Sequence, residues 1–190
     1  MTTRTAATAA RKDQILRAAI ALLAEQGYQA TTFDAICRLA GLSSKRLITY
    51  HFSGKGELFA AVAAKVVEDA EAYLRPSLEA AEGAREELFA FIRANTAFIA
   101  EHLDQVRALE QIIINGDRAW DPYHLDALKR LTELFAHGQR TGAFRPFDPR
   151  VMATTLRGAM DGAYGPLAEG MDPEQCANEL VQIFDRATRP

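Results

Sequence analysis

Basic and hydroxyl-bearing side chains gather in one short segment of the chain. Residues 31–59 read TTFDAICRLAGLSSKRLITYHFSGKGELF, in which two short amphipathic stretches meet at a Gly-Leu-Ser turn. The second stretch carries Lys45, Arg46, Thr49, Tyr50 and His51. Lysine and arginine suit phosphates and the O6/N7 edge of guanine, and hydroxyl groups suit phosphate oxygens. This pattern is typical of a helix-turn-helix whose second helix reads the major groove of DNA.

The upstream residues predict a helix that would support this pair. Apolar side chains recur at helical spacing on one face: Ile15, Ala18, Ala19, Leu22 and Leu23. Gly27 stands where a left-handed residue would end that helix. Thr31 and Thr32 are candidate N-caps for the second helix, which Gly41 closes, and either serine of the turn can cap the third.

The rest of the chain also predicts helices, since no long run alternates as a strand does. A fourth helix is expected from Lys55 to about Leu74, where Arg75-Pro76 would end it. Three Asp-Pro pairs, each a candidate N-cap followed by proline at the first helical position, open the last three helices. The later helices are predicted over 84–101, VRALEQIII, 123–140, 149–169 and 173–187. The fold class is therefore all-α, with about nine helices.

Composition excludes several classes of protein. The chain has 190 residues, of which 48% are hydrophobic and 25% charged, so it can bury one or two modest cores. Its apolar runs are far shorter than the ~20 residues that cross a bilayer. Because the N-terminus also lacks the apolar segment of a secretory signal, we expect a cytoplasmic protein without a membrane partner. Cys37 and Cys176 lie far apart without metal-ligand spacing, so we predict no metal, disulfide or cofactor.

Charge is distributed unevenly along the chain. Residues 1–60 hold eight of the 22 Lys/Arg and four of the 25 Asp/Glu, a net charge of +4. The remaining residues hold 14 basic and 21 acidic side chains, a net charge of −7. A basic segment joined to an acidic one fits a part that binds a polyanion and a part that does not, although so small a count can also arise by chance.

The segment RKDQILRAAIALLAEQGYQATT resembles the first helix of the TetR family of transcriptional regulators, followed by that family's Gly-Tyr-x-x-Thr-Thr turn. The resemblance covers about the first 60 residues, and the rest agrees in length and helix count. It implies a helix-turn-helix DNA-binding domain over residues 1–54 and a ligand-binding and dimerisation domain over 55–190. The expected partners are a palindromic double-stranded DNA operator, a second copy of the chain and a small apolar or amphipathic effector that releases a repressor.

The resemblance also assigns roles to residues. It implies phosphate contacts by Tyr50, His51 and Lys55, and by hydroxyl or N–H groups of Thr31 and Thr32. Base reading would fall to Ser44, Lys45, Arg46 and Thr49, although Lys45 and Arg46 also fit an ordinary solvated helix face and Tyr50 also fits the core. One more residue than is common in the family lies between Gly41 and Phe52. The buried anchor of the third helix is therefore Leu47 or Ile48, depending on the end from which one counts.

The family implies an effector site among the fifth to eighth helices and a dimer interface on the last two. Candidate effector contacts are Phe91, Asn95, Phe98, Ile113, Trp120, Tyr123, Met160 and Tyr164, although aromatic stripes at helical spacing are usually core. Asn95 interrupts an apolar face and needs a ligand, a water or a backbone partner. Candidate dimer contacts are Leu156, Ala159, Ala163, Leu167, Leu180 and Phe184.

Two other classes of function were weighed. An enzyme is disfavoured because the four histidines follow no recognised spacing and the pair Glu133 and His137 stands alone. A DNA-binding or interaction protein without sequence-specific, ligand-controlled regulation remains the alternative. The two differ in sequence preference, since a specific regulator should favour its own promoter region over random DNA by roughly 10³-fold or more.

Overall fold

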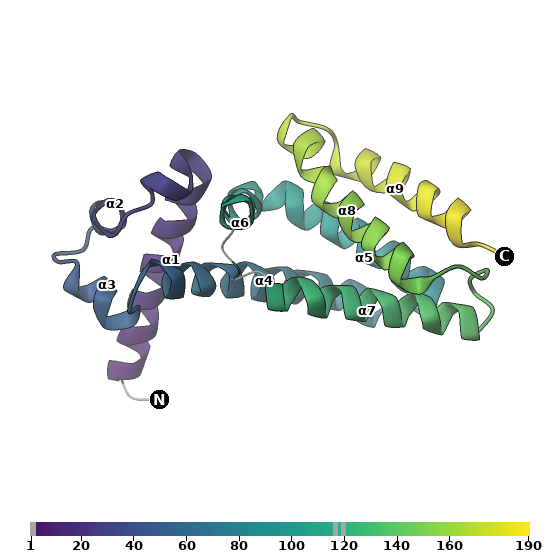
Figure 1. The fold of residues 1–190 in the computed structure, drawn as a ribbon, viewed down its shortest axis with the longest axis horizontal. Helices are drawn as coiled ribbons and strands as arrows, with labels where there is room; N and C mark the ends of the chain where they lie inside the picture. Colours follow the sequence, from purple (N-terminus) through teal and green to yellow (C-terminus); the bar gives the residue numbers. More distant parts are fainter. Residues whose placement is uncertain (1–2, 116–117, 119–120) are drawn as a thin grey trace. The chain divides into compact units, whose positions relative to one another are not determined.

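The computed structural model describes residues 3–115, 118 and 121–190. Within these residues the secondary structure is entirely helical, which confirms the predicted all-α class. The helices are α1 (Thr3–Ala30), α2 (Phe33–Leu39), α3 (Arg46–His51), α4 (Lys55–Glu79), α5 (Ala84–Glu101), α6 (Leu103–Ile114), α7 (Asp121–Arg140), α8 (Pro149–Ala168) and α9 (Pro173–Thr188), as Figure 1 shows. No helix in the described part of the chain is long and apolar enough to cross a membrane.

The helices form two compact units, which are described separately. The first unit comprises Met1–Val67 and Asp104–Asp121, and the second comprises Glu68–Leu103 and Pro122–Pro190. Helix α4 therefore contributes its first half to the first unit and its second half to the second. A functional boundary at residue 54 stays a prediction, because compactness does not define where DNA binding ends.

Local signals in the first unit act as the sequence predicts. Gly27 has a φ of 82° and interrupts α1, so the regular helix ends there although one further turn follows. The Thr32 hydroxyl accepts the Ala35 N–H at 3.2 Å and caps α2. After α2 the chain turns at Gly41, whose φ is 61°. Both glycines occupy the left-handed region, which a side chain would disfavour.

The burial of the α3 side chains shows where the extra residue between Gly41 and Phe52 lies. Ile48 and Phe52 are buried in the first unit, whereas Leu47 is half-buried. Counting back from Phe52 therefore identifies the anchor of α3 correctly, and counting forward from Gly41 does not. A loop can lengthen without rotating the helix that follows, because only the helix face must meet the core. We conclude that the turn before α3 accommodates the additional residue.

Helix α4 extends further than predicted. The expected end near Leu74 was wrong, because the helix continues through Pro76 to Glu79. The proline carbonyl still accepts the Ala80 N–H at 3.2 Å, and the ring lies only one turn from the helix end on an exposed surface. At such a position the lost hydrogen bond affects a single exposed carbonyl, while Leu74 remains buried.

The second unit is a bundle in which α5 packs against α8 and α9, and these two pack against each other. Its core includes Ile92 of α5, Phe135 of α7, Leu156 of α8 and Phe184 of α9. Asp148 and Asp172 accept the first backbone N–H groups of α8 and α9, each followed by proline, which confirms two of the predicted caps. Asp121, the third, is the first residue of α7 instead.

Candidate nucleic-acid interface

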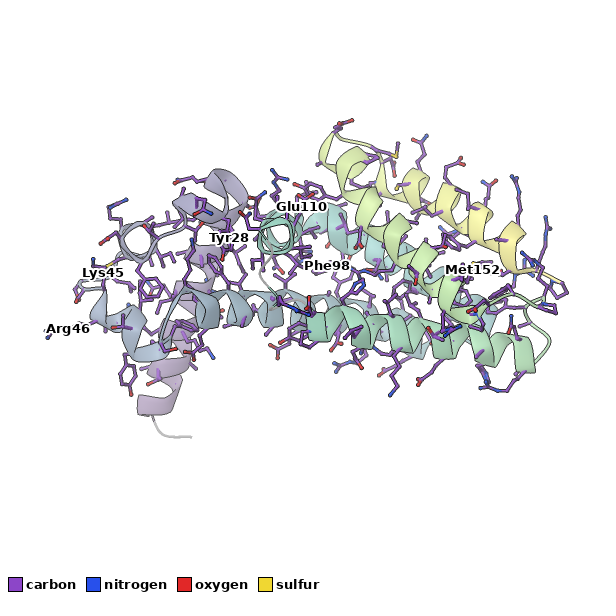
Figure 2. The ribbon with its side chains drawn as sticks, viewed as in Figure 1. Tyr28, Lys45, Arg46, Phe98, Glu110 and Met152 are labelled. Carbon is purple, nitrogen blue, oxygen red and sulfur yellow. The ribbon has the colours of Figure 1, made fainter. Side chains whose placement is uncertain are left out.

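Helix α3 exposes a polar face opposite its buried anchor. Arg46, Thr49 and Tyr50 are exposed, and Tyr50 keeps 76% of its surface accessible, so it is not a core residue. Figure 2 labels Lys45 and Arg46 at the beginning of α3, and both residues are exposed. An apolar anchor on one face and donors on the other are the arrangement that a groove-reading helix requires.

The residues around the α3 start are partly engaged with one another. The Ser44 hydroxyl accepts the Arg46 N–H at 3.1 Å. The N-cap residue of α3 is Lys45, which makes no side-chain cap hydrogen bond, so Ser44 acts from one position further upstream than an N-cap. Thr49 donates its hydroxyl to the Arg46 carbonyl at 3.3 Å. Each hydroxyl oxygen keeps further hydrogen-bonding capacity, so these contacts place the groups without removing them from a binding surface.

Lys45 forms an ion pair that the sequence did not indicate. Its Nζ lies 2.9 Å from Oδ1 and 3.1 Å from Oδ2 of Asp34, which stands in the first turn of α2. Both side chains are more than half exposed, so the pair contributes little to stability. The pair matters for DNA binding, because it places a carboxylate beside a predicted DNA contact.

Tyr50 and His51 lie together at the end of α3. Their ring centroids are 5.1 Å apart in an edge-to-face arrangement, and His51 is half-buried with its ring 6.3 Å from that of Phe52. The structure therefore brings this predicted pair together, with the tyrosine facing solvent and the histidine beside the core.

The two threonines before α2 differ sharply in exposure. Thr31 is 1% exposed, and its hydroxyl donates to the Gly27 carbonyl at 2.8 Å. This side chain joins the end of α1 to the start of α2 and does not present its hydroxyl at the surface. Thr32 is exposed and caps α2, so it retains a hydroxyl proton for an external acceptor.

Lys55 lies where the sequence predicts, at the first position of α4, but its side chain turns inward. Its Nζ donates to the Tyr28 carbonyl at 2.7 Å and lies 4.3 Å from the centroid of the Tyr28 ring. Partial burial lowers the pKa of this ammonium group below its usual value. The contact spans 27 positions in the sequence, so no local pattern could have indicated it.

The predicted effector contacts in the second unit are largely satisfied by the protein itself. Met160 is a core residue, and Phe91 packs against the same core. Phe98 is buried and stacks on His102 with ring centroids 4.5 Å apart. Asn95 donates to the Phe91 carbonyl at 3.1 Å, which supplies the backbone partner that was one of the three expected possibilities.

The remaining effector candidates are dispersed. Tyr123 and Tyr164 are half-buried in the second unit, whereas Ile113 is exposed and belongs to the first unit. Trp120 lies outside the described residues. The predicted set therefore includes a core group around Met160 and does not form one cluster within either unit.

The predicted dimer contacts also lie mainly inside the protomer. Leu156, Ala163, Leu167 and Phe184 are buried, and Ala159 and Leu180 pack against the core cluster. Much of the surface of these side chains is therefore covered within the protomer, and their role in a dimer stays a prediction. Such burial is expected, because the most apolar stripe of an amphipathic helix faces the core of its own chain first.

Helices α8 and α9 also carry small and apolar residues that are exposed. Gly158, Gly162 and Gly165 recur at helical spacing on the exposed side of α8, and no atom lies within 4 Å of a Cβ built at any of them. Val151 of α8 and Ile183 of α9 expose 64% and 56% of their surfaces. The glycines on the exposed side of α8 permit close approach by another helix, and the polar Thr155 and Asp161 are exposed on the same helix.

Comparison with known proteins agrees with the helix-turn-helix geometry. Residues 15–62 match the family model of bacterial regulatory proteins of the tetR family. The chain is 27% identical over 157 residues to the uncharacterized HTH-type transcriptional regulator YhgD of Bacillus subtilis, which covers 77% of this chain and 78% of YhgD. It is 33% identical over 123 residues to the HTH-type transcriptional activator FasR of Mycolicibacterium smegmatis, covering 65% of this chain and 54% of FasR.

Solved structures share the fold over nearly the whole chain. A proposed transcriptional regulator of Pseudomonas aeruginosa PAO1 has a TM-score of 0.80 at 25% identity, covering 94% of this chain and 90% of that one. AibR, solved with isovaleryl coenzyme A and operator DNA, has a TM-score of 0.77 at 23% identity, with coverages of 91% and 97%. A proposed regulator of Saccharomonospora viridis, solved with choline, has a TM-score of 0.79 at 21% identity, with coverages of 95% and 98%.

The fold and the exposed polar face of α3 define a helix-turn-helix DNA-binding protein. Residues 15–62 match the family model of bacterial regulatory proteins of the tetR family, and over most of its length the chain resembles DNA-binding transcriptional regulators. The family and its relatives act as regulators of transcription, and this chain is accordingly not an enzyme.

Proposed function

We propose that this chain is a homodimeric repressor that binds a palindromic operator and leaves it when a small apolar or amphipathic molecule binds. The observation that carries the proposal is the exposed polar face of α3, with Arg46, Thr49 and Tyr50 opposite the buried Ile48. In a two-fold symmetric dimer this face occurs twice and would meet half-sites about one helical turn of DNA apart. The proposal includes a cytoplasmic location.

Ligand control is supported by the complexes of similar proteins. AibR was solved with an acyl coenzyme A and the S. viridis protein with choline, so the fold accepts chemically different small molecules. For this chain the second unit, with its largely apolar core, is the part in which we place the effector. Repression is the direction proposed, although FasR is named an activator, and a promoter-reporter assay distinguishes the two.

Dimerisation is supported by the exposed small and apolar residues of α8 and α9. Gly158, Gly162 and Gly165 leave room for close helix packing, and Val151 of α8 and Ile183 of α9 add exposed apolar surface. Burying such surface against an identical copy would form an isologous interface, in which the same patch contributes from both protomers.

The decisive experiment is fluorescence polarization with DNA that flanks this protein's own gene, measured beside random duplexes of equal length over a salt titration. We expect a preference of roughly 10³-fold or more for a palindromic stretch at physiological salt. Equal affinity for all duplexes would contradict sequence-specific regulation and favour the alternative of a non-specific DNA-binding or interaction protein.

Base reading by α3 has its own test. Replacing Arg46 with alanine should relax the preference at particular base pairs, by about 1–3 kcal/mol at each pair that it reads. Arg140→Ala, which removes an equal charge from an exposed position in the second unit, serves as the matched control. If Arg46→Ala weakens binding to all sequences equally, Arg46 contacts phosphate and another residue reads the bases.

A further inference from the structure

The lysine that opens α4 is held inside the first unit. Lys55 Nζ donates to the Tyr28 carbonyl at 2.7 Å and lies over two aromatic rings, 4.3 Å from the Tyr28 centroid and 5.1 Å from that of Phe59. A carbonyl near the end of α1 and the faces of two rings all stabilise a cation. Moving this ammonium group to a phosphate would forfeit these contacts.

The turn that joins α3 to α4 carries a carboxylate that belongs to the protein. The backbone N–H and the hydroxyl of Ser53 both donate to Oε2 of Glu57, each at 2.7 Å. The carboxylate of Glu57 thus lies at the start of α4, where a helix would otherwise favour an external anion. A phosphate that approaches this turn meets the negative charge of Glu57, which a cation from another element would offset.

Helix α1 supplies such a cation. Lys12 is exposed, its Nζ lies 5.7 Å from the centroid of the Phe52 ring, and it is close enough to interact electrostatically with Glu57. Phe52 directly follows Tyr50 and His51, so Lys12 stands beside the end of the helix that carries the predicted DNA contacts.

Arg11 and Arg17 of α1 have side-chain partners at hydrogen-bonding distance, whereas the contact of Lys12 is with the Phe52 ring. Arg11 donates to the Gln14 side chain at 2.8 Å, and Arg17 pairs with Asp13 at 2.5 Å. Lys12 forms no ion pair with any residue that the structure describes. Its long, flexible side chain is therefore available to an external anion.

We propose that Lys12 contacts a backbone phosphate of DNA at the junction of α3 and α4, and that Lys55 serves instead as an internal clamp between α4 and the end of α1. The proposal rests on the proposed function, because it takes the exposed face of α3 as the DNA-reading face. It reassigns the phosphate contact from the lysine indicated by family resemblance to one that stands 43 positions earlier.

The test compares the salt dependence of DNA binding among single variants of the full chain. Lys12→Ala should reduce the slope of log K against log salt by about one, on random and flanking DNA alike. Lys55→Met, which keeps an unbranched side chain over the two rings, should leave the slope unchanged and lower the Tm. Arg17→Ala removes the same charge from α1 and serves as the control, with an unchanged slope expected.

Two results would overturn the proposal: a wild-type slope for Lys12→Ala, or a loss of slope in Lys55→Met equal to that expected for Lys12→Ala. A failure of the proposed function would appear in the wild-type protein and not in the variants. If the wild-type protein binds random and flanking DNA equally, sequence-specific regulation is wrong, yet the slopes on random DNA still decide which lysine contacts phosphate. If the wild-type protein binds no DNA, both proposals are wrong.

Discussion

The ion pair between Asp34 and Lys45 places a negative charge on a surface that is expected to meet a polyanion. The carboxylate partly neutralises Lys45 and would repel nearby phosphates. Such a charge weakens binding to every DNA sequence, whereas contacts to the correct bases favour the operator alone. We therefore interpret Asp34 as a residue that limits non-specific binding.

Replacing Asp34 with asparagine preserves the shape of the side chain and removes its charge. Affinity for random DNA should rise, the salt slope should steepen by about one, and the ratio of specific to random affinity should fall. Polarization titrations measure all three quantities, with Asp13→Asn as the control on α1. Unchanged random-DNA affinity in Asp34→Asn would place this carboxylate outside the DNA-contacting surface.

At the scale of elements, glycine has opposite effects in different helices. Gly138 lies in α7 beneath Phe144, and a Cβ added there would lie 2.0 Å from Cδ2 of that ring. Gly56 lies in the first turn of α4 with nothing within 4 Å of the same atom. Close packing therefore requires the first glycine, whereas the second mainly weakens its helix.

Gly138→Ala should destabilise the protein by about 1–3 kcal/mol, because the ring of Phe144 must move within a packed core. Gly56→Ala, the matched control, should leave stability unchanged or raise it by up to about 1 kcal/mol. Chemical unfolding followed by circular dichroism compares the two. Equal effects would mean that Phe144 can move away from α7 freely.

The cap of α8 predicts a dependence on pH. Hydrogen bonds from the Arg150 side chain and from the backbone N–H groups of Arg150 and Val151 lower the pKa of Asp148. Since the pKa is lower in the folded state, the contribution to stability is present above the unfolded pKa and disappears as pH falls through the folded value.

The Tm difference between the wild-type protein and Asp148→Asn should therefore be largest near neutral pH and shrink below about pH 4. Thermal unfolding of both proteins between pH 3 and pH 7 measures this difference. A difference that stays constant over the whole range would show that the ionised carboxylate contributes nothing to the cap.

At the scale of the whole molecule, the proposed dimer depends on the small residues of α8. Gly162→Leu should introduce a side chain into the closely packed interface and convert dimers into monomers. Sedimentation velocity measures the mass, and Gly56→Leu, at another exposed helical glycine, is the control. A wild-type mass for Gly162→Leu would show that two copies associate through a different surface.

Loss of the dimer should also change DNA binding. A single α3 contacts one half-site, so the monomer should bind a palindromic duplex far more weakly than the dimer while keeping its affinity for an isolated half-site. Polarization with both duplexes separates these cases. If monomeric Gly162→Leu binds the full palindrome with wild-type affinity, the operator is not bound by two α3 helices of a dimer.

The sequence by itself determined the features that depend on neighbours within a few positions. The spacing of apolar residues predicted the helices, Thr32, Asp148 and Asp172 were identified as caps, and Gly27 was recognised as a helix end. The turn and helix motifs of residues 31–59 also indicated the family. These properties are readable because helices and their caps form between residues that are close in the chain.

Only the tertiary structure decided which way particular side chains face. Of the two candidate anchors of α3, Ile48 is the buried one, and Leu156 and Phe184 belong to the protomer's own core. Lys55 turned toward Tyr28, 27 positions earlier. Contacts between residues so distant in sequence depend on how the helices pack. An apolar pattern shows that a helix buries one face, but it does not show which other element covers that face.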